Sequence, residues 1–129
     1  MRRTILLVVL LGAATGPARA AVVTATDIRS PSGLISCWAV IHSSEVECSA
    51  PYVHRFGELD PYLAVRPRGH SELGERGDYP GYGHKPRTLQ YGDTWKRRGI
   101  RCAMRTTGLT CRNRDAHGFH MQRGNVYRF

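Results

Sequence analysis

Four cysteines constrain the fold of this chain more than any other feature of its sequence. They stand at positions 37, 48, 102 and 111. No two of them have the close C-x-x-C spacing that is typical of zinc ligands, so we expect no metal. An even number of cysteines in a small protein of an oxidising compartment indicates two disulfides. Four cysteines allow three pairings, which the pattern of the flanking residues helps to distinguish.

The residues around the second pair favour a local disulfide. Apolar and polar side chains alternate through residues 100–105, which is the pattern of a half-buried strand. If Thr106–Thr107 forms the turn of a hairpin, Cys102 faces Cys111 across the two strands, within bonding reach. Threonines are uncommon in tight primed turns, so a turn that includes Gly108 and a bulge is the alternative.

The first pair of cysteines has the same relationship. The positions of Cys37 and Cys48 differ by an odd number, so the two residues can face each other across a hairpin whose tip lies at 41–44. We therefore predict the disulfides Cys37–Cys48 and Cys102–Cys111. Each closes a loop of about ten residues and contributes on the order of 2–3 kcal/mol in the chain-entropy description.

The N-terminal residues have the order of a secretory signal. Arg2 and Arg3 precede an apolar run over residues 5–11, and Ala18-Arg19-Ala20 supplies small residues where a signal peptidase cleaves. The apolar run is too short for a stable membrane anchor. We expect residues 1–20 to be a signal peptide that is removed after Ala20. The protein is then secreted or periplasmic, without a transmembrane segment.

The remaining residues, 21–129, are expected to form a single β-rich domain. The full chain has 129 residues, 41% of them apolar and 22% charged, which are the proportions of a globular protein and not of a disordered chain. Further strands are predicted at 22–28, 94–98, 119–122 and 126–129. The prediction is an all-β fold: a small, disulfide-clamped antiparallel sandwich or barrel, and a monomer.

The middle of the chain differs from the two hairpin regions. Residues 51–86 contain five of the seven prolines, together with several glycines. We expect this segment to be a long irregular loop inserted in the domain, with one short strand or turn that packs within residues 59–65.

Charge is distributed unevenly along the chain. Residues 21–84 contain five arginines and eight acids, a net charge of −3, whereas residues 85–129 contain eleven Lys and Arg against two acids, a net charge of +9. A strongly basic half favours an anionic partner, either a polymer or the envelope surface. The alternative is a solvated face that only provides solubility. No protein partner and no cofactor is indicated.

The candidate binding site is an arginine face. In the hairpin described above, the side opposite the cysteines carries Arg101, Arg105 and Arg112, and Arg114 continues it. The preceding strand adds further cations. Arg101 would face Arg112 directly, and like charges placed in this way destabilise a sheet. Such a surface could bind phosphates or an acidic polysaccharide. The candidate binding residues are Lys96, Arg98, Arg101, Arg105, Arg112 and Arg114.

Catalysis is the competing interpretation. Glu45, Glu47, His117 and His120 could supply an acid and a base. The chain has no nucleophile elbow, phosphate-binding loop or zinc-protease motif, so no catalytic residue is assigned. On a strand, His117 and His120 point to opposite faces, which argues against a shared metal ion, and we expect His117 to be a packed histidine. The leading function is a non-catalytic exported domain; the alternative is a small secreted hydrolase, such as a nuclease.

Several short motifs resemble one family of small secreted bacterial proteins, defined only as a domain of unknown function. The chain departs from the pattern at Ala116, where the family has glycine, and it lacks two central cysteines that members often carry. The resemblance covers residues 28–49 and 89–129. It implies a secreted β-rich domain with two disulfide hairpins and brings no activity. The matching residues are Ser30-Pro31-Ser32-Gly33, Ile35, Cys37, Tyr91-Gly92, Cys102, Gly108-Leu109-Thr110-Cys111, His117-Gly118-Phe119 and Tyr127-Arg128-Phe129.

Overall fold

A computed structural model describes residues 19–78 and 85–129. Nearly all of the predicted signal peptide, residues 1–18, lies outside the described residues. Every regular element of the described part is a β-strand. Within that part, no helix has the length and apolarity needed to cross a membrane. The prediction of an all-β fold is confirmed.

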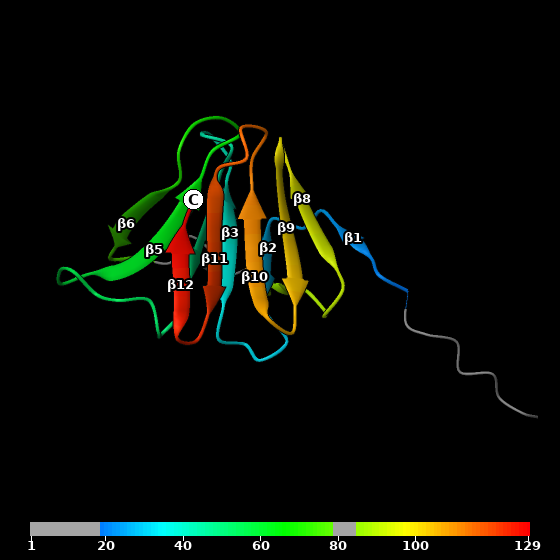
Figure 1. Ribbon diagram of the computed structural model, residues 1–129, viewed down its shortest axis with the longest axis horizontal. Helices are drawn as coiled ribbons and strands as arrows, with labels where there is room; N and C mark the ends of the chain where they lie inside the picture. The colour runs from blue at the N-terminus through cyan, green and yellow to red at the C-terminus, as the bar shows by residue number, and fades with distance from the viewer. Residues whose placement is uncertain (1–18, 79–84) are drawn as a thin grey trace, which may run out of the picture.

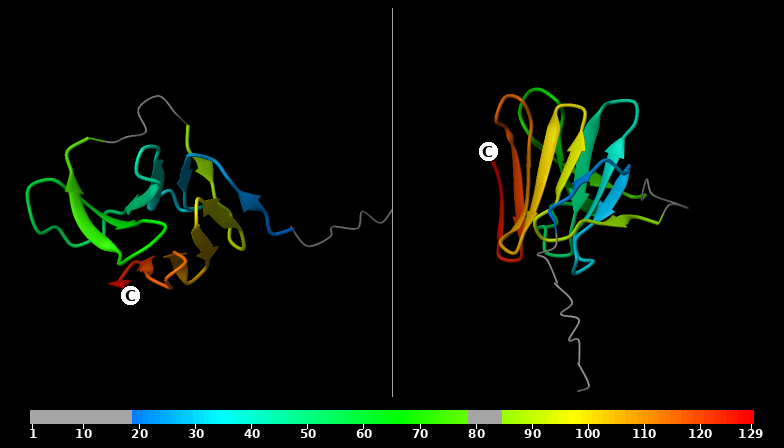
Figure 2. Two further views of the ribbon diagram at one scale, coloured as in Figure 1. Left: turned by 90° about the horizontal axis from the view of Figure 1, so that it is seen from above. Right: turned by 90° about the vertical axis from the view of Figure 1, so that its right-hand side faces the viewer.

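In the residues that the structure describes, twelve strands form two six-stranded sheets that pack as a sandwich and do not close into a barrel (Figures 1 and 2). The front sheet contains, in spatial order, β1 (Val22–Val23), β8 (Thr94–Arg97), β9 (Ile100–Arg105), β10 (Gly108–Arg112), β11 (Gly118–Gln122) and β12 (Asn125–Arg128). The back sheet contains β6 (Glu72–Arg76), β5 (Asp60–Val65), β4 (Glu45–Ser49), β3 (Ser36–Val40), β2 (Asp27–Arg29) and β7 (Arg87–Thr88). The strands predicted at 94–98, 119–122 and 126–129 correspond to β8, β11 and β12.

Both disulfide hairpins are present with the predicted register. Cys102 pairs with Cys111 between β9 and β10, and Cys37 pairs with Cys48 between β3 and β4; both pairs are bonded. The turn between β9 and β10 is the two-residue turn Thr106–Thr107, and the alternative turn with Gly108 and a bulge does not form. Gly108 follows it with a φ of 118°, which a residue with a side chain rarely adopts.

The core lies between the two sheets and includes both disulfides. Trp95 and Phe119 are the largest fully buried side chains, and all four cysteines are no more than 2% exposed. The inward positions of β9 and β10 are the apolar positions of the alternating pattern, which leaves their arginines on the outer surface. The other core residues of the front sheet are Val23, Ile100, Met104, Leu109 and Met121, and those of the back sheet and its loops include Ile28, Ile35, Val46, Leu63, Val65 and Leu89.

The N-terminal strand differs from the prediction. The residues expected as one strand at 22–28 form β1 in the front sheet and β2 in the back sheet, so the chain crosses between sheets at 24–26. Two hydrogen bonds from β8 hold this crossing: the Trp95 indole N–H donates to the Ala25 carbonyl at 2.7 Å, and Arg97 donates to the Thr24 carbonyl at 2.8 Å. As a result β1 runs parallel to β8 and β2 runs parallel to β7, and both sheets are mixed where only antiparallel pairing was expected.

The central segment is more regular than expected. The short strand predicted within 59–65 is β5, and a second strand, β6, pairs with it antiparallel and extends the back sheet (Figure 1). The expected loop character fits the stretches on either side, while residues 79–84 lie outside the described part. The loop between β5 and β6 reaches the front sheet, because Arg128 donates a hydrogen bond to the Ser71 carbonyl at 3.0 Å.

Candidate functional site

The outer face of the front sheet carries a continuous row of cations. The register places Lys96 opposite Arg101 and Arg101 opposite Arg112, on three neighbouring strands. Arg112 is opposite Gly118, whose backbone in turn exchanges hydrogen bonds with Phe129. Strands lie about 4.8 Å apart, so these side chains are close neighbours on the surface. The sequence predicted that Arg101 faces Arg112, and the strand register confirms it.

These cations line an open groove with a volume of about 860 Å³. Five of the six candidate residues from the sequence line it, and the structure adds Arg97, which makes six basic side chains. Arg105 is the exception: it lies in a separate depression together with Tyr91 and Arg123. The lining residues are Thr24, Lys96, Arg97, Arg98, Gly99, Ile100, Arg101, Ala103, Thr110, Arg112, Asn113 and Arg114.

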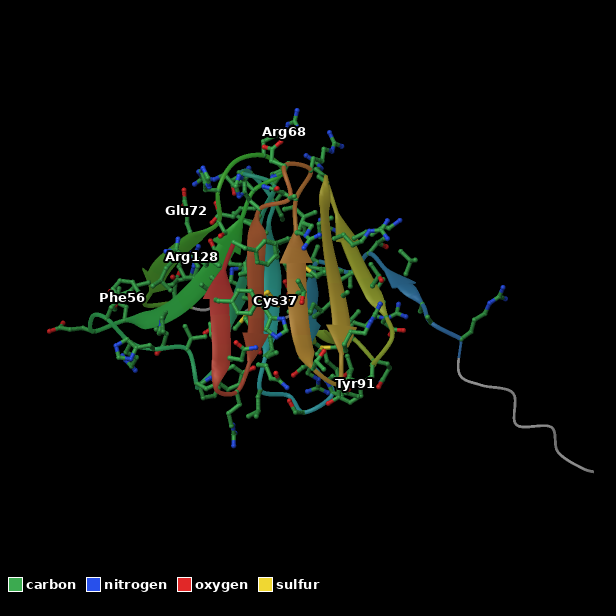
Figure 3. The ribbon with its side chains drawn as sticks, viewed as in Figure 1. Cys37, Phe56, Arg68, Glu72, Tyr91 and Arg128 are labelled. Carbon is green, nitrogen blue, oxygen red and sulfur yellow. A yellow bond between two sulfur atoms is a disulfide. The ribbon has the colours of Figure 1, made fainter. Side chains whose placement is uncertain are left out.

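The groove lies at one end of the sandwich. It is bordered by the β8–β9 turn at residues 98–99 and by the β10–β11 turn at 113–117. Figure 3 shows Arg68, which contacts Asp115 of the second turn, at that end and Tyr91 at the opposite end. Arg105 is on the same face of β9 as Arg101, but it lies outside the groove because it is at the end of the strand near Tyr91.

The cations of the groove have no ion pairs in the part of the chain that the structure describes, whereas the arginines of the central segment do. No acid is among its lining residues, and none of its six cations forms an ion pair within the described residues. The arginines of the central segment behave differently, since each of them has a carboxylate partner. Those pairs are Arg55–Asp60, Arg66–Glu45, Arg66–Glu72, Arg68–Asp115, Arg76–Glu47 and Arg76–Asp78.

Asn113 holds the turn that presents Arg114. Its side-chain oxygen accepts hydrogen bonds from the backbone N–H groups of Asp115 and His117, at 2.9 and 3.0 Å. Its amide nitrogen donates to the carbonyls of Arg66 and Gly69, at 3.0 and 2.7 Å. Asn113 is only 6% exposed, so one buried side chain ties this border of the groove to the β5–β6 loop.

An aromatic row continues the cationic row on the same face. The Thr110 hydroxyl and His120 Nδ1 are 2.8 Å apart, and the His120 ring stacks on Tyr127 with centroids 5.2 Å apart. The Arg112 guanidinium lies 5.1 Å from the centroid of the Phe129 ring. None of these aromatic residues is among the candidate binding residues predicted from the sequence. The alternation through 118–122, which puts His120 on the face of Arg112, is the signal that could have indicated this row.

The two histidines do not form a metal site. His117 lies in the turn before β11, where its ring contacts His70 at a centroid distance of 4.0 Å, while His120 is on the outer face of β11. Within residues 19–78 and 85–129, no group of three or more His, Cys, Asp or Glu side chains has the arrangement of a metal site. His117 is half-buried, with its backbone N–H bonded to Asn113.

The candidate acids belong to the other sheet. Glu47 is 2% exposed, and it accepts hydrogen bonds from the Trp38 indole at 2.7 Å and from two nitrogens of Arg76 at 2.6 and 3.0 Å. Burial raises the pKa of the Glu45 carboxyl above its usual 4.5, while Arg66 at 3.0 Å opposes that shift. Glu45 is paired with Arg66 of the β5–β6 loop and Glu47 with Arg76 of β6, and no hydrogen bond or ion pair among the described residues joins either carboxylate to His117 or His120.

The fold and this face define a class: a small two-sheet β-sandwich, clamped by one disulfide in each sheet, with an uncompensated basic groove. Residues 67–129 match the model of a family of unknown function, DUF6636. That range contains the whole groove except Thr24, and it excludes the Ser30–Gly33 motif of the resemblance. No curated protein and no solved structure matches the chain. The resemblance to a domain of unknown function is confirmed.

Proposed function

We propose that this protein is an exported, non-catalytic domain that binds an anionic polymer along the groove of the front sheet. The observation that carries the proposal is the set of six cations that line one groove without an acidic partner. Like charges brought together on adjacent strands destabilise a sheet. A bound polyanion offsets that repulsion and releases its own condensed counterions, which favours binding.

Export supports the choice of ligand. Two buried disulfides are typical of proteins from oxidising compartments, and the sequence of residues 1–20 has the order of a secretory signal. The domain then functions in the periplasm or outside the cell, where anionic polymers include nucleic acids and charged glycans. Five of the six groove cations are arginines, whose planar guanidinium groups bind phosphate through two parallel hydrogen bonds.

The aromatic row favours a polymer whose units have flat rings. Tyr127 is 48% exposed and lies on the same face as Arg112, with His120 stacked beneath it. Such a ring offers a surface on which a nucleobase can stack, as in proteins that bind single strands without sequence preference. The lining residues include no carboxylate that would accept hydrogen bonds from sugar hydroxyls. Single-stranded nucleic acid is therefore the ligand that this face fits best.

The test is a salt titration with labelled single-stranded DNA. Binding should weaken steeply as salt increases. The triple variant Arg101→Gln, Arg112→Gln, Arg114→Gln should reduce the salt slope by about two units, since each phosphate contact to a single strand contributes roughly 0.7. The DNA should remain uncleaved throughout, because the candidate acids are bound to arginines on the other sheet.

A matched control distinguishes binding in the groove from attraction by the overall positive charge of the protein. Lys85, Arg87 and Arg123 belong to the same basic half of the chain but do not line the groove. Their triple change to Gln removes the same charge and should leave most of the affinity. Equal losses in the two triple variants, or absence of binding at low salt, would contradict the proposal. Tighter binding to heparin than to DNA would favour an acidic glycan instead.

A further inference from the structure

The start of the folded domain is held by a buried carboxylate. The backbone nitrogen of Ala21 donates a hydrogen bond to Asp93 Oδ1 at 2.9 Å. Asp93 lies just before β8 and is only 6% exposed. The Ala21 carbonyl accepts a hydrogen bond from Thr94 at 2.9 Å, and Val22 is aligned with Thr94. Ala21 is therefore positioned from both sides, whereas Arg19 and Ala20 are exposed.

Asp93 has hydrogen-bond donors around it but forms no ion pair with a described residue. Its second oxygen, Oδ2, accepts a hydrogen bond from the backbone N–H of Gln90 at 2.9 Å. The ion pairs within the described residues include none to Asp93. Buried carboxylates are ordinarily paired with a positive charge, because removal of a charge from water is costly. The residue against Asp93 Oδ1 is the one that the sequence predicts to become the first of the mature chain.

We propose that cleavage between Ala20 and Ala21 turns this hydrogen bond into a buried ion pair between the new α-ammonium group and Asp93. Hydrolysis of the peptide bond consumes one water molecule. Its hydroxyl joins the Ala20 carbonyl carbon to give a carboxyl group, and its hydrogen joins the Ala21 nitrogen, which takes a further proton at neutral pH. The enzyme is an endopeptidase of the export machinery. The ammonium group then supplies the charge that Asp93 lacks and fastens β1 to the front sheet.

Removal of the signal peptide is thereby coupled to the stability of the folded domain. Before cleavage, Ala21 offers Asp93 one neutral amide donor. After cleavage, the same nitrogen offers a charged donor, and hydrogen bonds to charged groups are stronger than neutral ones. This inference does not depend on the polymer-binding function, since Asp93 does not line the groove.

The experiment uses protein exported from cells that express the full-length chain. N-terminal sequencing should give Ala21 as the first residue. Acetylation of the α-amine then restores a neutral amide at that nitrogen, the geometry that the structure already shows. We expect acetylation to lower the equilibrium constant for folding by roughly 10- to 100-fold, measured by urea unfolding.

The Asp93→Asn variant completes a double-mutant cycle. Acetylation should change its stability by much less than it changes the wild-type chain, because the carboxylate partner is absent. If the variant does not fold, the acetylated and free forms of the wild-type chain still give the comparison. Equal stability of these two forms, the same loss in both backgrounds, or a mature chain that starts at a residue other than Ala21 would overturn the proposal.

Discussion

The guanidinium group of Arg112 lies over the ring of Phe129, across a position that is occupied by glycine. Gly118 is opposite Arg112 in the register, and its backbone N–H and C=O bond to those of Phe129. The absence of a side chain at 118 allows β11 to approach β10 closely. This contact links the cationic row of the groove to the aromatic row beside it.

The Gly118→Ala variant should be strongly destabilised. A Cβ atom at this position would collide with the carbonyl oxygen of Cys111, and that backbone cannot move without disturbing the buried disulfide. We expect a loss of about 1–3 kcal/mol or more, read from the urea midpoint. Gly77→Ala is the control: its nearest neighbour is the end of the flexible Leu59 side chain at 3.3 Å, so the change should be within about 0.5 kcal/mol. Similar losses at both positions would contradict this account.

Tyr127→Ala should reduce affinity for single-stranded DNA more than affinity for heparin. Loss of one stacking surface corresponds to about 1–3 kcal/mol, or roughly 5- to 150-fold in Kd. Heparin has no flat bases to stack, so its binding should change little. Tyr91→Ala is the matched control, because Tyr91 is 53% exposed, against 48% for Tyr127, but lies away from the groove. Parallel losses for both polymers would show that Tyr127 supports the fold and not a base.

Replacement of Cys111 by Ser should lower stability by about 2–5 kcal/mol, measured by urea unfolding, since the Cys102–Cys111 bond closes a hairpin in the core. Mass mapping of the non-reduced wild-type protein should give Cys37–Cys48 and Cys102–Cys111. The Arg101–Arg112 register depends on this hairpin, so the variant should also lose affinity for anionic polymer. A bond between Cys37 and either distant cysteine would disprove the sheet arrangement.

Glu45→Gln should remove a pH dependence of stability. Burial raises the folded-state pKa of this carboxyl above 4.5, so between 4.5 and the raised value the folded state holds a proton that the unfolded state has released. Stability therefore falls as pH rises through that window. The difference in urea midpoint between wild-type and Glu45→Gln protein should favour the variant increasingly as pH rises above 4.5.

The control for this titration is Glu72→Gln. Glu72 is the second carboxylate partner of Arg66, and its side chain is 56% exposed. Its replacement removes a charge near the same arginine while Glu45 remains, so the pH dependence should persist. A slope that survives in Glu45→Gln protein, or that disappears in Glu72→Gln protein, would assign the effect to another group.

Local patterns explain which parts of the fold could be predicted. The register of both hairpins follows from period-two alternation and from the odd separation of each cysteine pair, and these features involve neighbouring residues only. The same alternation placed Arg101 and Arg112 opposite each other. The strand β6 was not predicted, because its residues Glu72–Arg76 are mostly polar and carry a glycine. Its place in the sheet depends on pairing with β5.

The candidate site could be predicted only in part, because alternation within one hairpin does not show which distant residues contact it. Arg105 lies on the same face of β9 as Arg101, but it is too far along the strand to reach the groove. Glu47 was considered as a possible acid, whereas its partners Trp38 and Arg76 come from other strands and engage it fully. The pairing of Ala21 with Asp93 joins residues 72 positions apart, a distance over which no sequence period can act.

Local sequence patterns were enough to predict the all-β class, the two disulfides, the facing arginines and the concentration of positive charge in residues 85–129. Each of these depends on composition or on alternation within one hairpin, where a side chain's direction is set by the backbone next to it. Three other features became known only from the folded structure: residues 22–29 divide between two sheets, Asn113 holds one border of the groove, and Arg112 contacts Phe129 across Gly118. These features depend on contacts between segments that are distant in the sequence. Such contacts form, and stabilise the protein, only when the two sheets pack together.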